Sequence, residues 1–334
     1  MSTNSETLFE AFLNQHDEHA WERILQALSP SIHEVDKNAT RIWFHFFPLS
    51  LARALASAED QEQLARKLQL QGKYRLADNI DSSHRFLYGH RYWPQVKAEV
   101  SALASSGVPS SLELASQIRE VARRVAKQVD APESLLAGIS AVAFMTLQQA
   151  GASAFKAAPG KVEKADGRSP EQVLRERARD DSQGLFGFLK GARKEWTVTF
   201  DEKDSDARFK LIHTQELTTA AANDKRDYTK RDPRCIPGGG PIPIECRSAA
   251  CGTCWVGVLG GAEKLSDVSR LEGSRIKTFG YIDTDDPKPL IRLACMAQAH
   301  GSASIVIPPW NGVFGKFIRG EKSMLEEAET GARG

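Results

Sequence analysis

The stretch CRSAACGTCWVGVLGG, residues 246–261, contains three of the five cysteines of this 334-residue chain. Four residues separate Cys246 from Cys251, two separate Cys251 from Cys254, and 40 separate Cys254 from Cys295. The first 234 residues contain no cysteine at all. The N-terminal residues include no apolar stretch typical of a secretory signal. In such a chain, clustered thiols indicate metal binding rather than disulfide bonds.

The spacing C-x4-C-x2-C, followed by a distant fourth cysteine, is the signature of plant-type [2Fe–2S] sites. Such a cluster needs four thiolates, two for each iron. One loop can supply three of them if it bends so that its backbone N–H groups point at the sulfur atoms. The residues between the cysteines are mostly small, which permits that bend: Ser248, Ala249, Ala250, Gly252 and Thr253.

Other uses of these thiols are open but fit the pattern less well. A zinc site usually has paired C-x2-4-C knuckles, whereas Cys295 stands alone. Buried inert cysteines would show no such spacing beside a Gly-rich loop. Cys235 lies outside the motif, and we predict it to be a spare thiol because four ligands complete a cluster.

The cysteine stretch, the segment LSDVSRLE at residues 265–272 and the segment RLACMAQAHGSASIVIP at residues 292–308 together resemble the [2Fe–2S] ferredoxin family. The resemblance covers about residues 195–310. It implies a β-grasp fold, transfer of single electrons, and a [2Fe–2S] cluster held by Cys246, Cys251, Cys254 and Cys295. The 40-residue gap before Cys295 is closer to that of the adrenodoxin-like branch.

The pattern of apolar residues predicts two domains. Residues 1–157 show three- and four-residue apolar spacing, which predicts an all-α bundle with a buried core helix within residues 135–155. Residues 158–194 are polar and charged, as is typical of a linker, and we expect a short helix within it from Pro170 to Asp181. WTVTF (196–200) and RFKLIH (208–213) alternate apolar and polar residues, and the charged DEKDSDA between them predicts a hairpin. The strands and short helices that follow predict an α+β domain over 195–317, which the resemblance implies to be ferredoxin-like. Residues 318–334 form a polar C-terminal tail.

Composition excludes several classes of function. The net charge of +1 and the 41% hydrophobic content give no reason to expect nucleic acid or an anionic membrane as partner. No apolar stretch predicts a transmembrane segment. Neither a G-x-G-x-x-G after a strand nor a G-x-x-x-x-G-K-[ST] motif is present, so nucleotide binding has no support. We therefore expect a cytoplasmic protein that transfers electrons rather than a stand-alone enzyme.

We predict that the chain relays one electron at a time between a redox donor and acceptor, and that the helical domain docks it to a dedicated partner or complex. The alternative is a redox enzyme whose helical domain binds haem or another cofactor fed by the cluster, with His84 and His90 as candidate ligands. A scaffold whose cluster senses redox state is a third possibility.

Three surfaces are candidates for steering or docking a partner. One is the basic run formed by Lys225, Arg226, Lys230, Arg231 and Arg234, and another is the acidic group Asp283, Asp285 and Asp286. The third is an aromatic set in the helical domain: Tyr74, Tyr88, Tyr92 and Trp93. For each of them, an ordinary solvated or core role is the competing interpretation.

Overall fold

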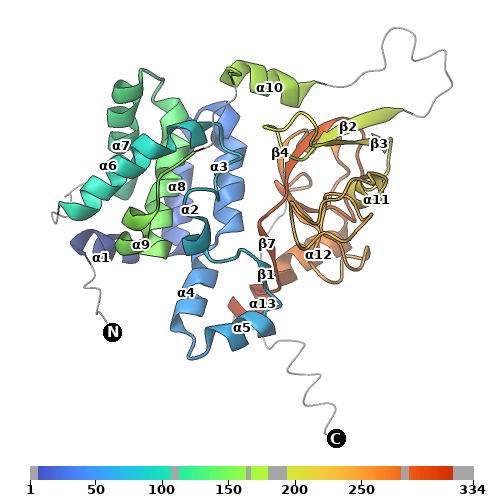
Figure 1. Cartoon of the computed structure of the whole chain (residues 1–334), viewed down its shortest axis with the longest axis horizontal. Helices are drawn as coiled ribbons and strands as arrows, with labels where there is room; N and C mark the ends of the chain where they lie inside the picture. Colours follow the sequence, from blue (N-terminus) through green and yellow to red (C-terminus); the bar gives the residue numbers. More distant parts are fainter. Residues whose placement is uncertain (1–6, 107–112, 163–166, 180–193, 280–285, 319–334) are drawn as a thin grey trace, which may run out of the picture. The chain divides into compact units, whose positions relative to one another are not determined.

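The computed structural model describes residues 7–106, 113–162, 167–179, 194–279 and 286–318. The chain divides into two compact units. Unit 1 comprises residues 1–53 and 75–175, and unit 2 comprises residues 54–74 and 176–334. In the described residues, unit 1 is helical and unit 2 contains a five-stranded sheet (Figure 1).

The helices of unit 1 are α1 (Leu8–Asn14), α2 (Glu18–Leu28), α3 (Glu34–Phe46), α6 (Trp93–Ser105), α7 (Leu114–Val129), α8 (Ser134–Ala150) and α9 (Ala152–Ala157). Short 3₁₀ turns lie at Ser29–Ser31, Leu76–Asn79 and Tyr88–Tyr92. Two further helices, α4 (Leu49–Ser57) and α10 (Pro170–Ala178), continue across the points where the chain passes from one unit to the other.

Helix α8 forms the core of unit 1. Every residue from Leu135 to Leu147 is buried, and the helix packs against α3, α6 and α7. Its small residues allow that close packing, because a Cβ at Gly138 would lie only 2.4 Å from the Thr40 hydroxyl. This confirms the predicted buried core helix. No helix in the described part of the chain is long and apolar enough to span a bilayer.

The main sheet of unit 2 has the order β3-β2-β6-β4-β5. Its strands are β2 (Glu195–Thr199), β3 (Arg208–Ile212), β4 (Trp255–Gly260), β5 (Ile291–Leu293) and β6 (Ala303–Val306). The helices of this unit are α5 (Gln61–Lys67), α11 (Leu217–Ala221), α12 (Arg270–Phe279) and α13 (Gly315–Ile318), with a 3₁₀ turn at Ala262–Lys264. A second, two-stranded sheet joins β1 (Gln71–Gly72) to β7 (Trp310–Asn311).

The pairing of the strands explains the burial of the sheet. The predicted hairpin of β2 and β3 is present, and β3 alternates exposed and buried residues as expected for a strand with one covered face. Strand β4 lies between β6 and β5 and is antiparallel to both. Its residues from Trp255 to Leu259 are all buried, which is consistent with its place inside the sheet.

A segment from the N-terminal part of the chain completes unit 2. In this segment, residues 54–74, which we call the strap, Gly72 pairs with Trp310 and Gln71 with Asn311. The Lys73 N–H donates to the Pro309 carbonyl at 2.9 Å, and the Leu68 carbonyl accepts from Val313 N–H at 2.7 Å. The apolar strap residues Leu55, Ala65 and Leu68 are buried.

The strap differs from the expected organisation, which placed residues 1–157 in one helical domain. Strand β1 has only two residues, and both are exposed, so that no local pattern of apolar residues marks it. Backbone pairing with β7, more than 200 residues later, creates it. The predicted helix in the linker is present as α10, whereas linker residues 180–193 and tail residues 319–334 lie outside the described residues.

Gly72 provides a test of the strap. It has a φ of +82°, and a Cβ there would lie 2.4 Å from the Pro309 carbonyl oxygen. Gly72→Ala should lower the free energy of unfolding by about 1–2 kcal/mol for the left-handed conformation and by a further 1–3 kcal/mol or so for the clash. Chemical denaturation followed by tryptophan fluorescence measures the change.

The matched control is Gly238→Ala, because Gly238 has a φ of +71° but nothing within 4 Å of its added Cβ. It should show only the conformational cost. Equal losses for the two variants would contradict the close approach of the strap to β7.

Candidate functional site

The loop that carries Cys246, Cys251 and Cys254 has an unusual backbone. Arg247, Ala249 and Gly252 have φ angles of 55°, 58° and 69°. For Arg and Ala this conformation costs about 1–2 kcal/mol each. Strain of this kind is concentrated at functional sites. Here it curls the loop into a concavity with N–H groups on its inner side.

Three of these N–H groups donate to one sulfur atom. The Cys246 Sγ accepts from Ser248 at 3.4 Å, from Ala250 at 3.3 Å and from Cys251 at 3.4 Å. Burial raises the pKa of Cys246, but the hydrogen bonds, those of Ser248 foremost, outweigh burial and lower the pKa to about 6. Since the thiolate is the form that binds metal, the loop is prepared to present Cys246 as a ligand.

The structure brings the distant Cys295 to this loop. Strands β4 and β5 pair with Trp255 opposite Leu293, and the Ala294 N–H donates to the Cys254 carbonyl at 3.0 Å. The Cys254 and Cys295 thiols are close enough to interact. This interaction raises the pKa of Cys254 well above its usual range and lowers the pKa of Cys295.

The four thiols therefore lie as two neighbouring pairs. Cys246 and Cys251 interact and are half-buried, whereas Cys254 and Cys295 are only 2% and 6% exposed. In the described residues, no three His, Cys, Asp or Glu side chains are placed around a single metal-ion position. Two pairs of thiols suit a cluster with two irons, each taking two thiolates. They suit a tetrahedral zinc ion less well.

Large aromatic side chains adjoin the more buried pair. Trp255 follows Cys254 directly and is 1% exposed. Its ring meets that of the fully buried Trp310 edge-on, with centroids 5.3 Å apart. Trp310 belongs to β7, which pairs with the strap. The strap is thus connected, through β7 and Trp310, to the start of β4, which directly follows Cys254.

A buried ion pair fixes the strand that leads to Cys295. The Arg292 guanidinium donates to both Glu272 carboxylate oxygens at 2.8 and 2.9 Å, and each side chain is 1% exposed. Glu272 also accepts from the Leu293 N–H at 2.9 Å. The sequence analysis missed this pair. Its only sequence signal is a charged residue within the short apolar run of β5.

Cys235 lies apart from the four thiols in these contacts. It is 5% exposed, and its Sγ donates to the Pro241 carbonyl at 3.5 Å. Burial raises the pKa of Cys235 to about 11. A thiol of such high pKa is largely protonated at neutral pH and is a poor ligand or nucleophile.

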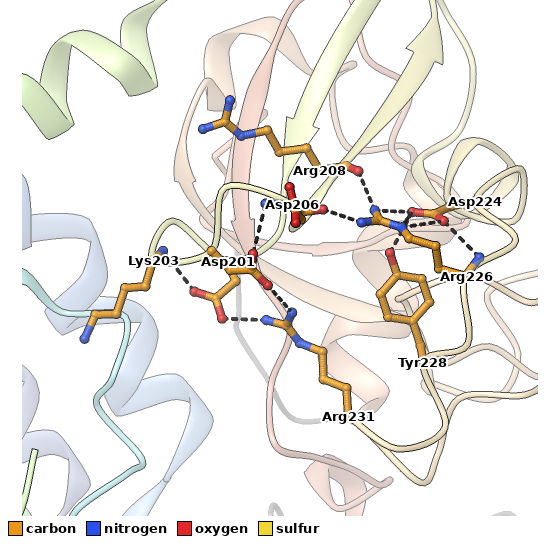
Figure 2. Close-up of polar contacts among 9 residues, drawn as sticks. Asp201, Lys203, Asp206, Arg208, Asp224, Arg226, Tyr228 and Arg231 are labelled. Atoms are coloured by element: carbon orange, nitrogen blue, oxygen red, sulfur yellow. Dashed lines mark hydrogen bonds and ion pairs between the residues drawn. The ribbon is translucent and has the colours of Figure 1, made fainter. Parts of the chain in front are cut away.

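The arginines of the predicted basic run form ion pairs and hydrogen bonds with other residues of unit 2. Figure 2 shows Arg226 between Asp224 and the backbone of the β2–β3 hairpin, and Arg231 beside Asp201. The Arg226–Asp224 and Arg231–Asp201 distances are 2.6 and 2.5 Å. Arg234 pairs with Asp232 at 2.6 Å. Arg226 and Arg231 hold the long segment before the cysteine loop against the hairpin. The charges of all three arginines are thus largely neutralised by nearby aspartates.

The acidic group and the aromatic set are the other two surfaces proposed from the sequence. Asp283 and Asp285 of the predicted acidic group lie outside the described residues. Asp286 accepts from the Lys288 N–H at 2.8 Å. In the aromatic set, Trp93 is fully buried and its Nε1 donates to Asp81 at 2.8 Å. The three tyrosines of that set are half-buried. The structure therefore contains no continuous exposed aromatic surface formed by these four described residues.

The two histidines considered as haem ligands face each other in the core of unit 1. Their Nδ1 atoms are 2.8 Å apart, and His84 and His90 are 0% and 1% exposed. The His84 Nε2 lies 3.2 Å from the Ile80 carbonyl. An ion between the Nδ1 atoms would require them to be roughly 4 Å apart, because metal–nitrogen bonds are about 2 Å long. Their mutual hydrogen bond occupies that position.

The Glu272–Arg292 pair yields a test. Glu272→Gln leaves the arginine buried without a counter-charge, so it should lower the free energy of unfolding by about 3–5 kcal/mol. The matched control, Asp267→Asn, breaks the exposed Asp267–Lys288 pair and should cost less than about 1 kcal/mol. Denaturant titration of both variants measures this difference. Similar losses in the two variants would contradict a clamping role for Glu272.

Comparison with known proteins agrees with this geometry. A family model described as a 2Fe-2S iron-sulfur cluster binding domain matches residues 237–300. No curated protein and no solved structure matches the chain. The match covers the whole cysteine loop, β4, α12, β5 and Cys295. The C-terminal part of this chain is thus a [2Fe–2S] cluster-binding domain of the ferredoxin family.

Proposed function

We propose that this chain is a one-electron transfer protein whose [2Fe–2S] cluster is held by Cys246, Cys251, Cys254 and Cys295, and that its helical part docks it to a dedicated redox partner. The domain family supports the role of electron carrier. The observation that carries the ligand assignment is the convergence of these four thiols on one strained loop and the end of β5.

The residues around the thiols have defined tasks in this proposal. When bound, the cluster accepts and releases one electron. The N–H groups of Ser248, Ala250 and Cys251 stabilise the negative charge of the Cys246 sulfur. The backbone of Ala249 contributes to lowering the pKa of Cys295. Because these donors are fixed by the backbone, they need little rearrangement when the charge changes.

The burial of the thiols suggests where electrons pass. Cys246 and Cys251 are half-buried, and Arg247, Ser248 and Ala250 around them are exposed. Cys254 and Cys295 are buried, with only 2% and 6% of their surfaces exposed. A partner can therefore approach the Cys246 edge most closely, while the opposite side of the site excludes water.

Several finer features belong to the same proposal. The mixed sheet crossed by α11 and α12 is consistent with a β-grasp arrangement. A cytoplasmic location fits a chain whose described thiols form no disulfide. A dedicated partner fits a near-neutral chain better than free diffusion between many partners does.

The haem-binding alternative has less support, because the Nδ1 atoms of His84 and His90 are hydrogen-bonded to each other.

Substitution of single cysteines tests the ligand assignment. Cys251→Ser should abolish the native visible absorption and electron paramagnetic resonance spectra, because it removes one thiolate from the half-buried pair. Cys235→Ser is the matched control. It exchanges a buried thiol that bonds only the Pro241 carbonyl in the described structure, so it should leave both spectra and the iron content unchanged. Loss of the spectra in Cys235→Ser, or their retention in Cys251→Ser, would overturn the assignment.

A further inference from the structure

Two groups of basic residues in unit 2 flank the cysteine loop in the sequence. The first is the run from Lys225 to Arg234, whose arginines are engaged with Asp224, Asp201 and Asp232 (Figure 2). The second is helix α12. Its basic residues are Arg270, Arg275 and Lys277, and its only acidic residue is Glu272.

Two cations of α12, Arg270 and Arg275, are not neutralised in this way. Glu272 faces inward, is buried and pairs with Arg292. Among the described residues, neither Arg270 nor Arg275 forms an ion pair. The nearest acidic residue before the helix, Asp267, is paired with Lys288 at 2.9 Å. Arg270 and Arg275 therefore keep their positive charges on α12.

An apolar residue lies within this positive surface. Leu271 is 48% exposed, and it is one of few large apolar side chains in the described residues with such exposure. Phe317, 38% exposed, lies on α13, which packs against α12. Exposed apolar residues flanked by arginine are typical of protein–protein interfaces.

The position of Arg270 gives a second argument. It is the first residue of α12, where the positive end of the helix dipole disfavours a cation. An acidic residue there would stabilise the helix. The helix dipole therefore does not stabilise the charge of Arg270, which is exposed and can contact another molecule.

The inner side of α12 connects this surface to the site. Glu272 accepts hydrogen bonds from Arg292 and from the Leu293 N–H, two residues before Cys295. The helix is thus fixed to the strand that presents the fourth thiol, and its orientation relative to the site is rigid.

We propose that the outer face of α12, formed by Arg270, Leu271 and Arg275, docks an acidic protein partner for electron transfer. This inference rests on the proposed function. In the docked complex, one electron leaves the reduced [2Fe–2S] domain and reduces a one-electron centre of the partner, and no bond forms or breaks. An acidic partner is indicated because the surface is positive and an opposite charge accelerates encounter.

The test uses two soluble haem proteins as acceptors, the acidic cytochrome b5 and the basic cytochrome c. The reduced full-length protein is mixed with each ferric acceptor in a stopped-flow instrument at low ionic strength. Arg270→Glu/Arg275→Glu should slow reduction of the acidic acceptor by about tenfold or more and remove most of its salt dependence. Reduction of the basic acceptor should not slow.

Two controls separate docking from structural damage. The single variants Arg270→Glu and Lys230→Glu reverse one charge each, and Lys230 is exposed on the other basic segment. Arg270→Glu should slow the acidic acceptor by about threefold, whereas Lys230→Glu should have little effect. The thermal midpoint of Arg270→Glu should be unchanged or raised, and its visible circular dichroism should match wild type.

The outcomes are distinct. Rates with the acidic acceptor within twofold of wild type for the double variant, or an equal loss for Lys230→Glu, would overturn the docking surface alone. If the wild-type protein with an intact cluster spectrum reduced neither acceptor, the electron-carrier function would fail and the docking surface with it.

Discussion

The pairing of β4 with β5 is the constraint on which the rest of the site depends. It places the end of one strand beside the start of the other, so that Cys254 and Cys295 meet although 40 residues separate them. The strained loop before β4 then brings Cys246 and Cys251 close to the thiols of Cys254 and Cys295. Its N–H groups are committed to sulfur rather than to secondary structure, and this commitment offsets the cost of its left-handed residues.

Contacts with other parts of unit 2 stabilise the pairing of β4 with β5. The buried Glu272–Arg292 pair ties α12 to β5, and a buried ion pair is strongly destabilising only when one partner is removed. The Trp255–Trp310 contact extends the support to β7 and, through β7, to the strap. A long hydrogen bond of 3.4 Å joins Gln71 of the strap to Glu245, the neighbour of Cys246. Residues from the N-terminal part of the sequence therefore contribute to the surroundings of the cysteine loop.

The sequence predicted the features that depend on local patterns. The cysteine spacing identified the cluster-binding domain, and the apolar spacing identified the buried helix α8 and the hairpin of β2 and β3. Features that depend on distant partners were missed. The two residues of β1 are exposed and polar or Gly, so that only pairing with β7 makes them a strand. Arg226, Arg231 and Arg234 looked like a free basic surface, because the sequence does not show which aspartates fold against them. The ligand roles of the four cysteines and the domain boundaries beyond the strap stay predictions.

The central claim is that this chain carries one [2Fe–2S] cluster that takes up a single electron. Its most direct test is a coulometric titration of anaerobically purified protein, followed by electron paramagnetic resonance and by iron and sulfide analysis. The account predicts about two iron and two sulfide ions per chain and a paramagnetic signal that grows to completion as about one electron per chain is added. Zinc without iron, iron without sulfide, or an iron-loaded protein that accepts no electron would contradict it.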